Sequence, residues 1–311
     1  MWVSLALLLL GLVTALVAPR LLARADWVER EPVVALWVWQ CVVAAVLMSF
    51  ALSMTISAAA AWQAVRGQVF AGAPRAVVEA YELSTHGPWS AVLAVVLAAG
   101  GLWTGAMLGR EIGTARARRR RRRCELLERA PLLPGEEPGG ERLVVLEGER
   151  AHAWWLPGTT PRLVITTAAL QRLKGRQLDA VLAHEQGHAR ARHDWLLHCS
   201  GALAGGFPGI PVFAAFRAEM HRLVELAADD VASRRFGRLT IALALVGLNE
   251  DRGVFGPGPA PDAHLPQRVH RLLTAAPRLT AGHRLRLTAT AALVPVFPVL
   301  VAFVPGLAAL G

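Results

Sequence analysis

The chain has 311 residues, of which 54% are hydrophobic, with a mean hydropathy of +0.40 and a formal net charge of +10. Its apolar runs are too long for core strands, which excludes an ordinary soluble globular protein. The three cysteines form no close pair, which argues against a disulfide framework and fits a reducing compartment for the polar part of the chain.

Four apolar segments predict membrane spans, at about residues 1–18, 32–61, 89–108 and 287–311. Each is close to the length that a helix needs to cross a bilayer. A signal peptide is the alternative for the first segment, but a charged n-region and a convincing cleavage site are missing, so we expect an uncleaved span. The fourth segment contains three prolines, which a span tolerates where its neighbours satisfy the freed carbonyl groups.

The positive charge gathers in one block, Arg116 and 118–123, directly after the third apolar segment. A basic run beside a span usually faces the cytoplasm and its anionic lipids. A nucleic-acid-binding arm is the competing interpretation, but the run has no interleaved aromatic residues, and we expect no direct nucleic-acid partner. This orientation places both chain termini and the loop at 62–88 outside, in a multi-pass protein of the cell membrane.

The region between the third and fourth spans, residues 110–286, holds the groups able to do chemistry and is expected to be cytoplasmic. After the basic segment at 110–123, a Pro/Gly-rich stretch at 131–140 predicts a linker. We then expect short strands, followed by two helices. The strands are predicted at 142–146, 152–156 and 162–167, and the helices at 178–198 and 218–236.

The segment between these two helices, residues 200–216, is apolar but broken by glycines and prolines. We expect it to form buried core or to dip into the membrane interface, rather than to make a fifth span. The predicted fold class is therefore mainly α and integral to the membrane. Three spans lie in residues 1–109, an α+β zinc-protease domain in 110–286, and a fourth span in 287–311.

The pentapeptide HEQGH, His184 to His188, is the strongest chemical motif in the chain. On a helix, His184 and His188 lie one turn apart on the same face, where two imidazoles can hold one Zn²⁺. Glu185 lies beside them, where it can deprotonate a water that the metal activates. Chance alone produces such a pattern in a chain with ten histidines often enough that the motif needs support.

A zinc hydrolase also needs a third protein ligand. The sequence VELAADD on the second predicted helix offers Glu225, with Asp229 one turn later and His221 one turn earlier. If Glu225 binds the metal, Asp229 is placed to accept a hydrogen bond from the outer nitrogen of a ligating histidine. The alternative is an ordinary solvated acidic helix face.

The pattern HEQGH followed by ELAAD resembles the HExxH…ExxxD pattern of gluzincin membrane proteases. Three spans, a basic cytoplasmic protease domain and a fourth span are similar to the M56 family, which contains the antibiotic-sensing receptors BlaR1 and MecR1. The related M48 proteases share the zinc pattern, and the stretch AWWLPGTTPRLVITTAAL resembles the one before their zinc helix. Since the penicillin-binding domain of the receptors is missing after the fourth span, β-lactam sensing is not expected.

The resemblance implies a role for each matching residue. His184, His188 and Glu225 would bind one Zn²⁺ per chain, and Asp229 would support a histidine ligand. Glu185 would act as general base and then as proton donor to the leaving amine.

Three further roles stay open. Asp194 is a candidate for orienting the site, with a solvated aspartate as the alternative. HLPQRVHRLL distantly resembles a C-terminal motif of M48 enzymes, which makes His264 or Arg268 a candidate for stabilising the oxyanion. His221 is an alternative for that role, and each of the three alone is more often structural.

These observations predict a membrane zinc metalloendopeptidase that hydrolyses peptide bonds of a cytoplasmic protein. By resemblance, the leading substrate is a BlaI-type transcriptional repressor in a signalling pathway; the second hypothesis is an M48-like quality-control protease. A non-catalytic membrane sensor or scaffold is the third, and a homodimer stays open. We expect a peptide substrate to add to an exposed strand edge at HAWWL, residues 152–156, although its tryptophans fit a domain core equally well.

Overall fold

The computed structural model describes residues 2–83, 88–129, 142–156, 162–249, 264–274 and 277–310. The predicted linker at 131–140 lies outside these residues, as does Pro157-Gly158, where the sequence predicts a turn between the second and third strands. The chain folds into two compact units. The first, which we call the membrane unit, comprises residues 1–109, 200–218 and 279–311, and the second, the sheet unit, comprises residues 110–199 and 219–278.

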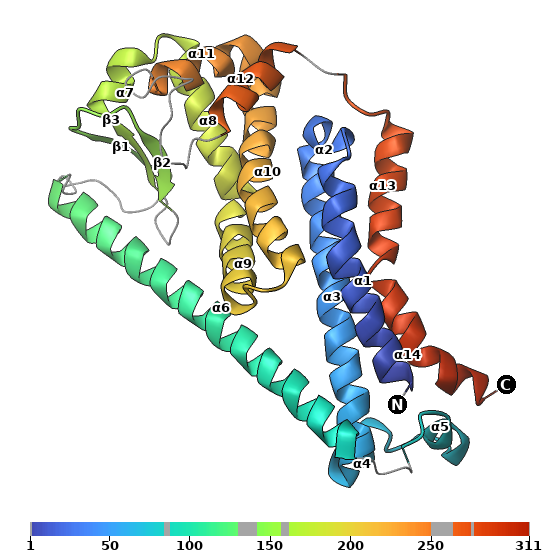
Figure 1. The fold of residues 1–311 in the computed structure, drawn as a ribbon. Coiled ribbons are helices and arrows are strands. Elements are labelled where there is room, and N and C mark those ends of the chain that lie inside the picture. The colour runs from blue at the N-terminus through green and yellow to red at the C-terminus, as the bar shows by residue number, and fades with distance from the viewer. Residues whose placement is uncertain are drawn as a thin grey trace. The chain divides into compact units, whose positions relative to one another are not determined.

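Among the described residues, three helices are long and apolar enough to cross a bilayer. They are α1 (Trp2–Ala23), α3 (Pro32–Ala61) and the part of α6 (Pro88–Arg129) at Trp89–Arg118. Three of the predicted spans are thereby confirmed as apolar helices of spanning length. Helix α6 continues without a break through the arginine block, so the third apolar segment and the basic segment form one helix (Figure 1).

The fourth predicted span is not one straight helix. It is a pair, α13 (Ala281–Leu293) and α14 (Val296–Ala308), bent by 44° at the break. Pro295 lies at this break, where it lacks the N–H that would continue the ladder and its ring crowds the preceding turn. The described residues therefore contain three candidate spans, or four if the bent pair crosses as one.

Helices α1 and α3 pack closely through small residues. A Cβ atom added to Gly11 would lie 3.1 Å from Cβ of Ser49. The Ser53 hydroxyl donates a 3.1 Å hydrogen bond to the carbonyl oxygen of Ser4 on α1. Small residues and hydroxyl bonds of this kind are what membrane helices use to approach each other. The short helices α2 (Trp27–Arg30), α4 (Gln63–Val69) and α5 (Arg75–Ala80) connect the spans.

Residues 200–218 belong to the membrane unit, rather than to the domain that the sequence assigned to 110–286. They comprise the end of α9 (His193–Gly206) and the start of α10 (Pro211–Phe236). The Trp103 indole N–H donates a 2.8 Å hydrogen bond to the carbonyl oxygen of Gly206, and the rings of Trp39 and Phe216 lie 6.2 Å apart. Contacts with α3 and α6 thus hold this segment in that unit, with Val212, Phe213 and Phe216 buried, while Pro208, Gly209 and Pro211 are exposed.

The sheet unit contains a three-stranded sheet in the order β1-β3-β2. Its strands are β1 (Arg142–Leu146), β2 (Ala153–Leu156) and β3 (Arg162–Thr166), within a residue of the predicted ranges. Strand β1 runs parallel to β3 and β2 runs antiparallel to it, so β2 is an edge strand, as HAWWL was expected to be. Helix α7 (Thr167–Arg172) follows β3 directly, and Thr166 caps its first turn.

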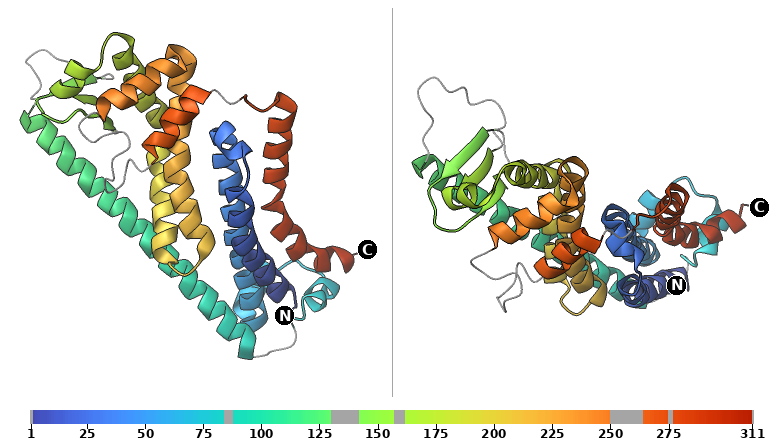
Figure 2. Two further views of the ribbon diagram at one scale, coloured as in Figure 1. Left: turned by 45° about the horizontal axis from the view of Figure 1, so that its top comes forward. Right: turned by 90° about the horizontal axis from the view of Figure 1, so that it is seen from above.

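Three helices pack together beside strand β2, and one of them contacts it. Helix α8 (Arg176–Arg190) contacts β2, and α11 (Arg238–Leu248) packs against both α8 and α12 (Leu265–Thr274) (Figures 1 and 2). Ala180, Ala183, Ile241, Leu245 and Leu265 form the shared core of these three helices. This packing fixes the face of α8 that carries the HEQGH histidines.

The predicted single helix at 178–198 is two helices in the structure. Helix α8 ends at Arg190 and α9 begins at His193. Between them, Arg192 adopts a φ of +50°, in the left-handed region that ends a helix and redirects the chain. The sequence carries no signal for this turn, because glycine or asparagine normally occupies such a position and arginine does not.

Candidate metal centre

Three predicted ligands converge at one point in the sheet unit. His184 and His188 come from successive turns of α8, and Glu225 comes from α10. One ligand atom from each of the three lies within 4.8 Å of the others. The two helices lie close together at Gly187, where a Cβ atom would be in ordinary van der Waals contact, 3.6 Å from Cα of Ala228 on α10.

The spacing of the ligand atoms fits a tetrahedral metal ion. The two histidine Nε2 atoms are 3.2 Å apart, and they lie 3.5 and 3.4 Å from the two carboxylate oxygens of Glu225. Four-coordinate zinc with bonds of about 2.0–2.1 Å separates its ligand atoms by about 3.3–3.4 Å. The His-His-Glu donor set and its spacing therefore fit Zn²⁺.

The outer nitrogen of each histidine lies close to a buried polar group, as an ion pair for His184 and as a hydrogen bond for His188. Nδ1 of His184 lies 3.0 Å from Oδ1 of Asp229, which is completely buried. Nδ1 of His188 lies 2.9 Å from Nδ1 of His193, which is also buried. Partners of this kind fix the ring orientation and the tautomer of a metal-binding histidine.

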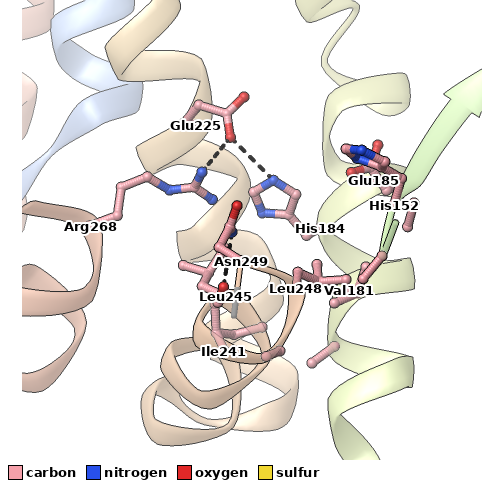
Figure 3. Close-up of a pocket in the computed structure, with 14 residues that line it drawn as sticks. His152, Val181, His184, Glu185, Glu225, Ile241, Leu245, Leu248, Asn249 and Arg268 are labelled. Atoms are coloured by element: carbon pink, nitrogen blue, oxygen red, sulfur yellow. Dashed lines mark hydrogen bonds and ion pairs between the residues drawn. The ribbon is translucent and has the colours of Figure 1, made fainter. Parts of the chain in front are cut away.

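Arg268 on α12 joins the carboxylates of the cluster. Its Nε and Nη2 atoms donate 2.8 and 2.7 Å hydrogen bonds to the two oxygens of Asp229, and its Nη1 atom lies 2.8 Å from Oε2 of Glu225. Figure 3 shows Glu225 between the Arg268 guanidinium and the His184 ring. Planar, forked contacts of this kind are the strongest that arginine makes with carboxylates.

These contacts shift the pKa values of the cluster. Burial alone would lower the pKa of His184, but its contacts with Asp229 and Glu225 outweigh burial and raise it to about 10. Burial and the neighbouring charge of His184 lower the pKa of His188 to about 4. Burial would raise the pKa of Glu225, yet the contacts with His184 and Arg268 hold it well below its usual range. The cluster is thus an ionised acid beside a protonated imidazole, and a bound cation would replace that proton.

A cleft of about 150 Å³ opens beside the cluster. Its lining includes His184, Glu185, Glu225 and Arg268, together with Ala153, the first residue of β2, and the preceding His152. Figure 3 shows Glu185 beside His152, across from Glu225 and Arg268. The predicted base, two predicted ligands and the predicted edge strand therefore meet in one cavity. Apolar side chains of α11 supply much of the remaining wall.

The other candidates from the sequence lie outside this cleft lining. His264 directly precedes α12, and its backbone carbonyl accepts the N–H of Arg268. His221 is exposed on α10, one turn before Glu225. Asp194 lies in the first turn of α9, next to His193. Burial lowers the pKa of His193, and the charge of Asp194 offsets only a small part of that lowering.

His193 also belongs to the site, although the sequence did not predict it. The chain HEQGHARARHDW shows it five residues after His188, a spacing that does not place two residues on one face of a continuous helix. Only the left-handed turn at Arg192 brings the two rings together, and this turn has no sequence signal. A histidine shortly after a zinc motif was the one available hint.

A family model described as peptidase family M48 matches residues 115–204. The match includes the sheet, α7 and α8, and therefore both histidines and Glu185, but it ends before Glu225. It supports the M48 part of the predicted resemblance and suggests a metallopeptidase, whereas the M56 part receives no such support. No curated protein and no solved structure gives a significant match to the chain.

Proposed function

We propose that this protein is an integral-membrane zinc endopeptidase. The observation that carries the proposal is the spacing between the Nε2 atoms of His184 and His188 and the carboxylate oxygens of Glu225. These distances match the ligand-to-ligand distances around a tetrahedral zinc ion. The M48 match over the same zinc helix and the three apolar helices of spanning length support it independently.

The chemistry follows from the groups around the cleft. His184, His188 and Glu225 would hold a zinc ion, which would supply Lewis acidity towards a peptide carbonyl and a water. Glu185 lines the cleft beside His184, where it takes the proton of the attacking water and returns it to the leaving amine. Asp229 and Arg268 hold His184 and Glu225 in place through the contacts described above. We assign Arg268, rather than His264, to the cleft wall that faces the substrate.

We infer that an extended peptide binds along the edge of β2. This strand pairs only with β3 among the described strands, and its first residue and the preceding His152 line the cleft. Main-chain hydrogen bonds to such an edge give affinity with little dependence on side chains. The arginine block on α6 supports a cytoplasmic location for the sheet unit, with both termini outside.

The M48 match favours a quality-control protease that acts on membrane or membrane-associated proteins. Cleavage of a BlaI-type repressor is the competing substrate assignment, which rests on the M56 resemblance. Proteomic comparison of cells carrying the natural chain with cells carrying Glu185→Gln separates the two. Many stabilised membrane proteins in the variant support quality control, and a single uncut cytoplasmic repressor supports signalling.

The enzyme assignment itself is tested on the purified full chain with an unfolded protein such as casein. We expect proteolysis that chelator abolishes and that Glu185→Gln lowers by at least about a hundredfold. Glu149→Gln, at an exposed acid outside the cleft lining, serves as the matched control and should keep full activity. Full activity of the Glu185→Gln enzyme would overturn the assignment.

A further inference from the structure

His193 is buried among the groups of the metal centre, although the chemistry above gives it no task. Its side chain lies at the start of α9 with 5% of the residue exposed. Its Nδ1 atom is 2.9 Å from Nδ1 of His188, and the two rings stand nearly perpendicular, at 82°. Two ring nitrogens at this distance share one hydrogen bond, so one of them must donate and the other accept.

We propose that His193 is a positioning residue for the zinc ligand His188, an inference that rests on the proposed function. The inner Nε2 of His188 faces Glu225 and His184, so a metal needs the lone pair of that atom. A neutral imidazole with a free Nε2 carries its proton on Nδ1. His188 therefore donates through Nδ1, and His193 accepts through its own Nδ1 and keeps its proton on Nε2.

The backbone turn before His193 makes this contact. Helix α8 ends at Arg190, and the left-handed Arg192 turns the chain so that α9 starts beside the last turn of α8. A residue with a side chain is strained in this conformation, because its Cβ atom crowds the carbonyl oxygen of the backbone. Such strain persists where the surrounding structure over-determines it, and it gathers at functional sites. Here the turn sets His193 against His188, five residues earlier.

The outer nitrogens of the two zinc histidines consequently face different kinds of acceptor. Asp229, a carboxylate, faces the outer nitrogen of His184, whereas a neutral imidazole faces that of His188. A carboxylate acceptor raises the basicity of a metal-binding histidine more than a neutral acceptor does. His193 thus orients His188 without adding a further negative charge to the carboxylates of the site.

The test compares two replacements of His193 in the purified full-length protein. His193→Leu introduces an apolar side chain of similar size and removes the acceptor, so the N–H of His188 loses this partner. His193→Asn places a carbonyl oxygen close to where Nδ1 lies and restores the acceptor. His270→Leu, at an exposed histidine on α12, is the matched control.

Zinc affinity is measured by competition with a chromogenic chelator, and the visible absorption spectrum of the Co²⁺-substituted protein reports the ligand geometry. We expect His193→Leu to weaken zinc binding about 10–100-fold and to change the Co²⁺ spectrum. His193→Asn should stay within about threefold of the natural protein, as should His270→Leu.

The results separate this inference from the proposed function. If the natural protein binds zinc and His193→Leu binds it equally well with an unchanged Co²⁺ spectrum, the inference is wrong and the zinc assignment stands. If the natural protein binds no zinc, the proposed function itself fails. Equal losses in the Leu and Asn variants would show that only the shape of histidine matters there, which also contradicts the acceptor role.

Discussion

Replacing Arg268 by methionine should destabilise the metal-free protein far more than the zinc-bound protein. Arg268 is 11% exposed at its side chain, and it donates two hydrogen bonds to Asp229, whose side chain is fully buried. A third contact joins it to Glu225. Without the guanidinium, the metal-free site keeps two carboxylates against the single positive charge of His184.

The magnitude follows from the burial of Arg268 and Asp229. Removing one partner of a buried ion pair costs about 3–5 kcal/mol, because the other charge stays buried without compensation. A bound Zn²⁺ takes over the charge that faces Glu225, although it does not replace the fork on Asp229. A hydrogen bond to a charged group contributes about 1.5–3 kcal/mol, so the loss in the zinc-bound form should be smaller by about that amount.

Thermal unfolding of the full chain in detergent, followed by tryptophan fluorescence with chelator or with excess zinc, measures the difference. We expect Arg268→Met to lower the Tm by on the order of 10 °C in chelator and by clearly less in zinc. Arg271→Met is the control on the same helix. It loses a 2.9 Å pair with Asp230, which keeps its bond to Arg278, so its smaller effect should not depend on zinc.

Equal destabilisation of the Arg268 variant with and without zinc would refute the reasoning. It would mean that a bound metal does not replace the guanidinium as the positive charge beside Glu225. A zinc-dependent effect of the Arg271 variant would do the same, since that pair lies outside the His-His-Glu cluster.

Three further predictions test the shell of the site and its backbone. Asp229→Asn should weaken zinc binding about 10–100-fold in a chelator competition, because the amide is a poorer acceptor for His184; unchanged affinity would remove Asp229 from the site. Arg192→Gly should leave the free energy of unfolding unchanged or raise it by up to about 1 kcal/mol, since glycine adopts the left-handed φ without strain. Arg192→Pro should disrupt the turn, because proline cannot adopt a positive φ. A lower Tm for the glycine variant would contradict the inference that the turn is strained. Gly187→Leu should lower both the Tm and the zinc affinity by pushing α8 from α10, at about 1–3 kcal/mol, while Gly187→Ala should be nearly neutral; a neutral leucine would show that the two helices are not in close contact there.

The sequence predicted the parts of this fold that depend on local periodicity. Three apolar helices, the three strands and the zinc helix appear close to the expected residues, because hydrophobic period and length carry their signals. The shared face of His184 and His188 was also accessible, since residues four apart on a helix lie on one face. Glu225 was expected as the third ligand because a zinc site needs one and because ELAAD resembles the second part of the gluzincin pattern.

The remainder depends on tertiary contacts that leave no local pattern. The turn at Arg192 is unusual for arginine, so the single predicted helix is two and His193 went unnoticed. Arg268 reaches Asp229 across 39 residues of chain, and no periodicity relates the two. Residues 200–216 were expected to form buried core or to dip into the membrane interface, and their composition does not say which helices they contact. The contacts of this segment with Trp39 and Trp103 show that it packs in the membrane unit.

The central claim is that His184, His188 and Glu225 hold one zinc ion. Elemental analysis of the purified full chain after dialysis, side by side with Glu225→Gln and with His270→Leu, tests it most directly. We predict about one zinc per chain in the natural protein and in His270→Leu, and a large loss in Glu225→Gln. A natural protein without stoichiometric zinc, or a Glu225→Gln variant that keeps it, would contradict this account of the site.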